Sequence, residues 1–190
     1  MKVLKFGGTS VANPQNIKLV LEIVEQKSKE DKLIVAVSAF SGVTDLLLLA
    51  AQKAASKDDS YRDVVLQIEK KHLEAIKELV PANEQTALLH YCKKNISYLE
   101  TLLDGCYLLG ELTARTSDMI VSFGELLSSY IIAEAMKQKV ANSSFKDSRE
   151  LIKTNNNFGK AEVYFEITNK NIRNYFSDHS AQVIVIPGFI

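Results

Sequence analysis

The sequence contains little of what marks a specialised chain. Its 190 residues include only 2 cysteines, 3 prolines and 8 glycines, and 23 basic side chains balance 23 acidic ones. So few glycines and prolines exclude a collagen-like or low-complexity chain. The balanced charge creates no long-range field that would favour nucleic acid or an anionic membrane surface, so we expect neither partner. Apolar runs are interrupted every few residues, and the start of the chain lacks the pattern of a secretion signal, so we expect no membrane-spanning helix and no leader.

Residues for redox or metal chemistry are equally scarce. Cys92 and Cys106 fall in one predicted helix, where a rise of about 1.5 Å per residue separates them by about 21 Å. That distance is far beyond disulfide reach, so we expect two reduced, buried thiols and a cytoplasmic protein. The histidines lack the spacing of a metal site, and we expect none. They are His72, His90 and His179.

What remains is an ordinary globular composition, with 46% hydrophobic and 24% charged residues. The length allows one large domain or two small ones with a sizeable core. A strand of alternating character at 2–6 is followed by a glycine loop and a helix starting at Asn13-Pro14. An apolar segment at 33–37 comes next, followed by a small-residue loop and another helix near Thr44. The continuous apolar character of 33–37 predicts a strand covered on both faces. This repeated order predicts an α/β fold with parallel strands and with ligands outside their carboxyl ends.

The middle of the sequence is predicted to be helical. Apolar residues keep helical spacing over 60–80 and again over 83–107. We expect an antiparallel pair of helices attached to the sheet, forming a helical insertion at about 60–115 whose role is packing.

Helices and strands are expected to alternate again after the insertion. We predict a helix at 117–137 and a short helix behind the capping-box spacing of Asp147 and Glu150. Three further strands are expected, at 140–145, 161–165 and 183–186. Only four residues follow the last strand, where an α/β fold would place a functional loop. We therefore expect this chain to be the amino-terminal piece of a longer protein.

The strongest candidate for chemistry is the loop that follows the first strand. Lys5 is the last charged residue before Gly7 and Gly8. Backbone N–H groups at two successive glycines can approach an anion closely, and an ammonium beside them can offset the charge of a transferring phosphoryl group. The spacing matches neither a P-loop nor a dinucleotide fingerprint. The alternative interpretation is a simple turn after a strand.

Two further features are candidates for binding a small molecule. Glu125 lies among apolar neighbours beside Gly124, and burial of its carboxylate would require a partner such as an α-amine. Helical spacing places three hydroxyls on its side, those of Ser122, Ser128 and Ser129. Hydroxyls also gather between residues 38 and 44, after the second strand. The alternatives are a partly exposed Glu on an ordinary amphipathic helix and hydroxyls that serve only as helix caps.

Five segments together resemble the aspartokinases of the amino-acid kinase superfamily. They are 5–11 (KFGGTSV), 37–47 (VSAFSGVTDLL), 122–128 (SFGELLS), 147–152 (DSRELI) with Thr154, Phe158 and Gly159, and 187–190 (PGFI). Their order and spacing agree with the family across the whole chain. Related kinases for glutamate, carbamate or UMP share the Lys-Gly-Gly pattern but not Phe-Gly-Gly-Thr-Ser.

The resemblance implies a three-layer αβα sandwich with a mostly parallel sheet. It implies ATP-dependent phosphorylation of the β-carboxylate of L-aspartate, the first step toward lysine, threonine and methionine. The transfer is direct, with Mg²⁺ beside ATP, so positioning and electrostatics provide the catalysis. A homo-oligomer is implied for the full-length enzyme.

The resemblance also implies roles for individual residues. Lys5 would be catalytic and would neutralise charge on the transferring phosphoryl group, while Gly7, Gly8 and Thr9 would complete the phosphate-binding loop. The aspartate pocket would be formed by Ser38, Thr44, Glu125 and Phe189, with Glu125 on the α-ammonium. None of the three histidines would bind a metal.

The resemblance covers only the amino-terminal, substrate-side part of such a kinase domain. The segment that clamps the substrate carboxylate, the nucleotide half and the regulatory domains of the family lie beyond residue 190, so we expect this chain alone to be inactive. The helical insertion resembles the type fused to a homoserine dehydrogenase. Two alternatives stay open: another acyl-phosphate-forming amino-acid kinase, and a noncatalytic interaction module.

Overall fold

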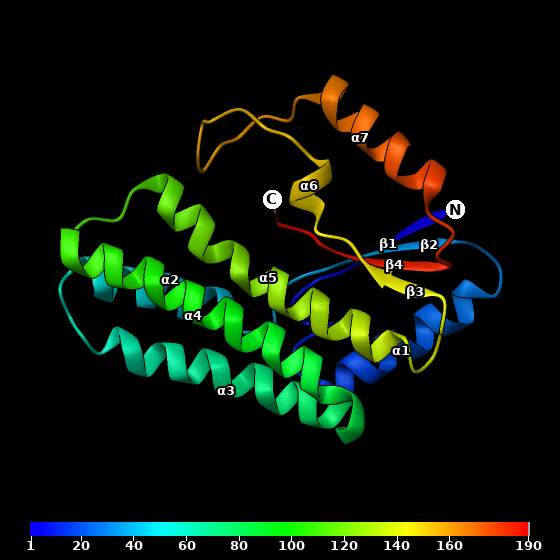
Figure 1. Ribbon diagram of the computed structural model, residues 1–190, viewed down its shortest axis with the longest axis horizontal. Helices are drawn as coiled ribbons and strands as arrows, with labels where there is room; N and C mark the ends of the chain where they lie inside the picture. Colours follow the sequence, from blue (N-terminus) through cyan, green and yellow to red (C-terminus); the bar gives the residue numbers. More distant parts are fainter. Residues whose placement is uncertain (190) are drawn as a thin grey trace.

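Four strands form one sheet in a computed structural model that describes residues 1–189 (Figure 1). The strands are β1 (Lys2–Phe6), β2 (Leu33–Val37), β3 (Ser143–Phe145) and β4 (Val183–Pro187). Their order across the sheet is β1-β2-β4-β3, and every pair is parallel. The carboxyl ends of β1, β2 and β4 therefore lie side by side, since Phe6, Val37 and Pro187 are in register.

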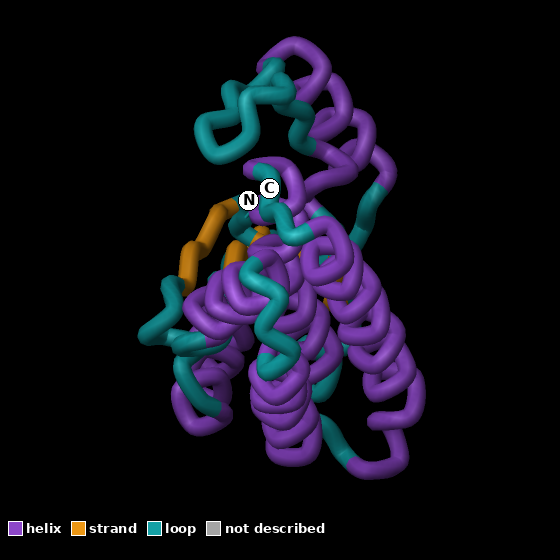
Figure 2. Tube along the Cα trace, turned by 90° about the vertical axis from the view of Figure 1, so that its left-hand side faces the viewer, coloured by secondary structure: helices purple, strands orange, loops and turns teal. Residues whose placement is uncertain are grey.

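Helices lie on both sides of this sheet. They are α1 (Pro14–Ser28), α2 (Val43–Ala55), α3 (Tyr61–Leu79), α4 (Gln85–Leu109), α5 (Ala114–Met136), α6 (Ser148–Leu151) and α7 (Phe165–Asp178). Helices α1 and α5 pack on one face, and α6 and α7 lie on the opposite side (Figures 1 and 2). The predicted three-layer αβα architecture is confirmed, and the sheet is parallel throughout the described residues.

The two faces of the sheet are covered unequally. In β2, Leu33, Val35 and Val37 are buried beneath the helices, whereas Ile34 and Ala36 on the other face are only half-buried. The prediction that this strand is covered on both faces was therefore only partly right. The second face carries only α6, α7 and their connecting loop, and it leaves Val3 of β1 exposed.

The helices α3 and α4 form the predicted antiparallel pair, linked by a short 3₁₀ turn (Ala82–Glu84). They pack against α2, α5 and each other rather than against the strands. The prediction that they attach to the sheet was therefore wrong: α5 lies between them and β4. Cys92 and Cys106 are free thiols buried on α4, as expected, and burial raises the pKa of Cys92 to about 12.

Helix α5 lies between the sheet and the helical pair. It is the one helix in residues 1–189 that is long and apolar enough to cross a membrane, with a mean hydropathy of 1.4 over 18 residues. The prediction of no membrane-spanning helix rested on the interruption of apolar runs, whereas this helix passes the test of length and composition alone. However, 72% of that segment is buried inside the fold, as in the core helix of a soluble protein.

Element boundaries differ from the predictions where side chains cap the backbone. Helix α5 begins three residues early because the Thr113 hydroxyl accepts from the Thr116 N–H at 3.1 Å. The strand expected at 161–165 does not form: Val163 makes a single bridge to Thr154, and the Asn155 carboxamide binds the backbone of the loop instead. The strand expected at 140–145 is only Ser143–Phe145.

Gly124 is required where α5 meets α2, and Gly124→Ala is expected to lower the free energy of unfolding by about 1–3 kcal/mol. An added Cβ would lie 2.9 Å from the Ala39 Cβ and 3.2 Å from the Leu47 Cδ1. Gly105→Ala on α4 is the control, because nothing lies within 4 Å of its added Cβ; it should gain up to about 1 kcal/mol in helix propensity. Urea unfolding of both variants measures the difference, and equal effects would contradict the close approach.

Candidate functional site

A cavity of about 210 Å³ opens at the carboxyl ends of β1, β2 and β4. It is lined by Lys5, Phe6, Gly7, Ala36, Val37, Ser38, Glu125, Gly188 and Phe189. Four separate segments contribute: the first strand and its loop, the end of β2, the middle of α5 and the residues after β4. This is the position at which parallel α/β sheets bind their ligands.

The glycine loop leaves Lys5 at the edge of the cavity. Leu4 and Phe6 point toward the core, so strand alternation turns Lys5 to the other face, where it is exposed. The loop closes on itself, since the Gly7 carbonyl accepts from Ser10 N at 2.9 Å. Among the ion pairs of residues 1–189 none includes Lys5, so its ammonium is available to an anion in the cavity.

Ser38 lies between the first strand and α5. Its N–H donates to the Phe6 carbonyl at 3.1 Å, and its own carbonyl accepts from the Ser128 hydroxyl at 2.8 Å. Gly8 is close by, because a Cβ added there would lie 3.9 Å from the Ser38 Oγ. The Ser38 hydroxyl does not cap the next helix: Gly42 holds the N-cap position of α2 without any side-chain cap.

Glu125 is half-buried, and its carboxylate faces the segment after β4. The Phe189 N–H donates to Glu125 Oε2. Gly188 allows this approach, since an added Cβ would lie 3.0 Å from the same oxygen. The carboxylate thus has a backbone partner on one oxygen and stays in contact with the cavity.

The serines expected to form a polar stripe beside Glu125 serve the backbone instead. Ser129 donates to the Glu125 carbonyl at 2.5 Å, and Ser128 donates to that carbonyl at 3.3 Å as well as to Ser38. Ser122 donates to the Met119 carbonyl at 2.7 Å. The sequence pattern found the right residues but the wrong partners, because a helical serine reaches the carbonyl one turn back more easily than a neighbouring carboxylate.

The structure brings together five of the eight residues that the sequence singled out. Lys5, Gly7, Ser38, Glu125 and Phe189 line the cavity, and Gly8 lies beside Ser38. Two do not line it. Thr9 is exposed, with its carbonyl accepting from the Asn16 side chain at 2.9 Å, and Thr44 is exposed on the first turn of α2.

Gly188 is one of four lining residues to which sequence reasoning gave no individual role; the others are Phe6, Ala36 and Val37. The Gly188 N–H donates to the Val37 carbonyl at 3.2 Å, which continues the β4 pairing one residue beyond the strand. The Pro-Gly dipeptide was the signal that could have identified a turn at this position.

A cluster of polar side chains outside the cavity joins the start of α6 to α5. The Arg149 guanidinium makes a fork with both carboxylate oxygens of Asp147, at 3.0 and 2.6 Å, and donates to the Ser122 hydroxyl at 3.1 Å. The hydrogen bond that Arg149 donates to Asp147 raises the pKa of Arg149. Asp147 caps α6 as predicted, but the Glu150 carboxylate pairs with Lys146, so the capping box stays half-formed.

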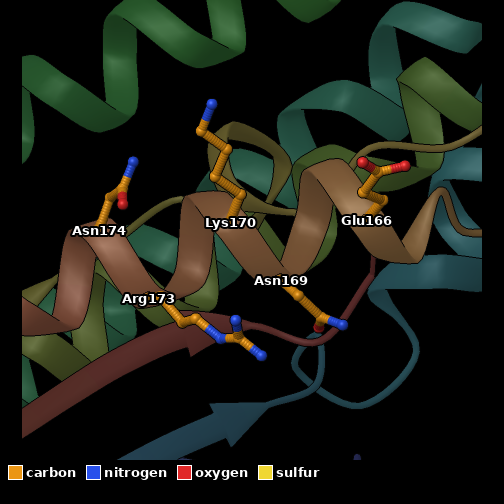
Figure 3. Close-up of a pocket in the computed structure, with 5 residues that line it drawn as sticks. All are labelled: Glu166, Asn169, Lys170, Arg173 and Asn174. Carbon is orange, nitrogen blue, oxygen red and sulfur yellow. The ribbon is translucent and has the colours of Figure 1, made fainter.

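A larger hollow of about 500 Å³ runs along α7. It is lined only by polar side chains of that helix, as Figure 3 shows. Lys170 and Asn174 project from one side of the helix and Asn169 and Arg173 from the other. Because these side chains do not converge, the hollow has no arrangement that would bind a specific ligand. Within residues 1–189, no three His, Cys, Asp or Glu side chains are grouped closely enough to hold a metal ion.

The family model described as "Amino acid kinase family" matches residues 1–190. The chain belongs to this family. Membership implies the use of ATP.

Curated proteins similar to this amino acid kinase chain include aspartokinases. The bifunctional aspartokinase/homoserine dehydrogenase 2, chloroplastic, of Zea mays is 36% identical over 189 residues, which are 99% of this chain and 20% of the relative. Aspartokinase 1, chloroplastic, of Arabidopsis thaliana is 31% identical over 194 residues, which are 99% of this chain and 33% of the relative. The chain therefore spans about a fifth to a third of the length of these relatives.

The same fold occurs in a solved aspartokinase. The structure of E. coli aspartokinase III in complex with aspartate and ADP superposes with a TM-score of 0.86 at 23% identity, covering 99% of this chain and 40% of that one. The likeness confirms the fold of this amino acid kinase chain.

Proposed function

We propose that this chain is the amino-terminal, substrate-side part of an aspartate kinase, with α3 and α4 as its helical insertion. The reaction is ATP-dependent phosphorylation of the L-aspartate β-carboxylate to 4-phospho-L-aspartate, at the start of lysine, threonine and methionine synthesis. The observation that carries the proposal is the cavity, in which Lys5 and the glycine loop of the first strand meet Glu125 of α5. The E. coli enzyme of the same fold is described as a complex with aspartate and ADP.

In this proposal Glu125 holds the α-ammonium of aspartate, because its carboxylate faces the cavity and is fixed by the Phe189 N–H. Ser38 and the Phe189 backbone border the rest of the amino acid. Thr44 stays a proposed contact that would require the first turn of α2 to turn toward the substrate.

The Lys5 ammonium would offset charge on the transferring phosphoryl group. The backbone N–H groups of Gly7, Gly8 and Thr9 would donate hydrogen bonds to phosphate oxygens. The transfer is in line and direct, so the chain's contribution is orientation and electrostatic stabilisation. Mg²⁺ would accompany ATP, held mainly by phosphate oxygens and water, as is usual for this ion. The rest of the nucleotide would bind outside residues 1–190, and we expect this chain alone to be inactive.

Location in the cytoplasm and assembly into a homo-oligomer also stay proposals. The plant relatives are named as chloroplastic proteins.

A coupled assay of ADP release by the full-length gene product tests the function. ATP is supplied with aspartate, glutamate or each of the other amino acids, and the acyl phosphate is trapped with hydroxylamine. Turnover that requires aspartate supports the proposal. Turnover with a different amino acid would favour another acyl-phosphate-forming kinase, and no turnover with any of them would favour a noncatalytic interaction module.

Glu125→Gln in the full-length gene product is expected to raise the aspartate KM by about tenfold or more and to leave the ATP KM nearly unchanged. The carboxamide retains the shape and the Phe189 contact but loses the charge that attracts an α-ammonium. Initial-rate kinetics with each substrate varied in turn measures the split. Equal losses for both substrates would instead identify Glu125 as a structural residue of α5.

A further inference from the structure

The loop at residues 38–42, between β2 and α2, borders the cavity at one end only. Ser38 lines the cavity and is fixed to α5 through its carbonyl. The rest of the loop runs away from the cavity toward the helical pair, and Gly42 adopts a positive φ of 75° at its end. A loop that places a substrate-facing hydroxyl must be held at both ends, since small misplacements at a reacting centre are costly.

Helix α3 supplies the second attachment through two neighbouring residues. The His72 ring stacks on the Phe40 ring, with centroids 5.2 Å apart and planes 30° apart. The Lys71 ammonium donates to the Ser41 carbonyl at 3.1 Å. Two successive loop residues are thus held by two successive helix residues, one through an apolar face and one through a charged donor.

His72 has an unusual place for a histidine. Its side chain is fully buried, and its Nδ1 lies 2.7 Å from the Ile68 carbonyl, so Nδ1 carries the proton and donates. Within residues 1–189, Nε2 has no hydrogen-bond partner. A buried acceptor without a partner is unfavourable, and leucine would fill a helix core without that cost. The feature that leucine lacks is the flat ring face presented to Phe40.

We propose that Lys71 and His72 are positioning residues, through which the helical insertion sets the place of the substrate-side loop 38–42. The insertion then contributes to amino-acid binding from outside the cavity, in addition to packing. The consequence for aspartate rests on the proposed function, whereas the anchoring of the loop does not.

Three variants of the full-length gene product test the anchoring by hydrogen exchange of peptides that cover residues 38–42. His72→Ala and Lys71→Met should each accelerate exchange in this loop by about tenfold. His72→Phe, which retains a flat ring over Phe40, should exchange like the wild type. Val64→Ala is the control: it removes buried volume from the same helix about two turns, or about 12 Å along the axis, from His72.

Kinetics of the same variants tests the consequence. His72→Ala and Lys71→Met should raise the aspartate KM by about three- to tenfold and change the ATP KM by less than about twofold. His72→Phe and Val64→Ala should have the aspartate KM of the wild type.

The two measurements separate the possible failures. Loop exchange that is no faster in His72→Ala than in Val64→Ala would overturn the positioning role. Faster loop exchange without a change in the aspartate KM would also overturn it, because the loop would then not bear on the substrate. If the wild-type protein does not act on aspartate, the proposed function fails, and the KM comparison is made with the amino acid that it does accept.

Discussion

Replacing Lys5 by alanine in the full-length gene product is expected to lower kcat by about 10²- to 10³-fold, with a much smaller effect on the aspartate KM. Lys5 lines the cavity from the carboxyl end of β1, beside the glycine loop, and its ammonium forms no ion pair within residues 1–189. A cation in that place acts on charge that develops during phosphoryl transfer and contributes little to binding the ground state. Steady-state kinetics at saturating ATP measures the two constants separately.

Lys2→Ala is the matched control on the same strand. Lys2 is exposed like Lys5, but its ammonium pairs with Asp31 at 2.7 Å at the far end of β1. An exposed pair of this kind contributes little to stability, so this variant should keep wild-type kinetics. A Lys5→Ala enzyme within about threefold of the wild type would contradict the catalytic assignment.

The sequence predicts the α/β core of this fold well because each strand and helix there carries its own signal. The apolar strand at 33–37, the Asn13 cap with Pro14 and the helical spacing in α3 and α4 are all local features, and each forms the predicted element. The short elements were harder. The segment 161–165 has the residues of a strand, but it pairs only with the loop residues 153–155, through a single bridge outside the sheet, so tertiary context decides its structure.

In the candidate site, too, the sequence predicts some features and tertiary contacts decide others. Residue type and strand position identified Lys5, the glycine loop and Glu125, because a cation beside two glycines and an acid among apolar residues are unusual in any sequence. Which groups touch could not be predicted. The bond from Phe189 N to Glu125 joins residues 64 positions apart, and the stacking of Phe40 on His72 depends on how α3 lies against the loop.

His72 also predicts how the stability of the fold depends on pH. Burial lowers the pKa of His72 from 6.5 to about 4. Between those values the unfolded chain binds a proton that the folded protein does not, so the free energy of unfolding falls as the pH falls. As the pH falls from 6.5 to 4, protonation of His72 should lower the free energy of unfolding by about 3 kcal/mol, and the loss is complete only below pH 4.

His72→Phe isolates this contribution from that of the carboxylates, which also titrate in acid. Phenylalanine keeps the ring against Phe40 and cannot bind a proton, so the variant should lose about 3 kcal/mol less than the wild type between pH 7 and pH 4. Urea unfolding at a series of pH values measures both curves. His90→Gln, which replaces an exposed histidine on α4, is the control for the loss of a histidine outside the core. Parallel curves for wild type and His72→Phe would show that His72 is protonated as readily in the folded protein as in the unfolded chain. That result would contradict the assignment of His72 as a buried, neutral ring that supports the loop 38–42.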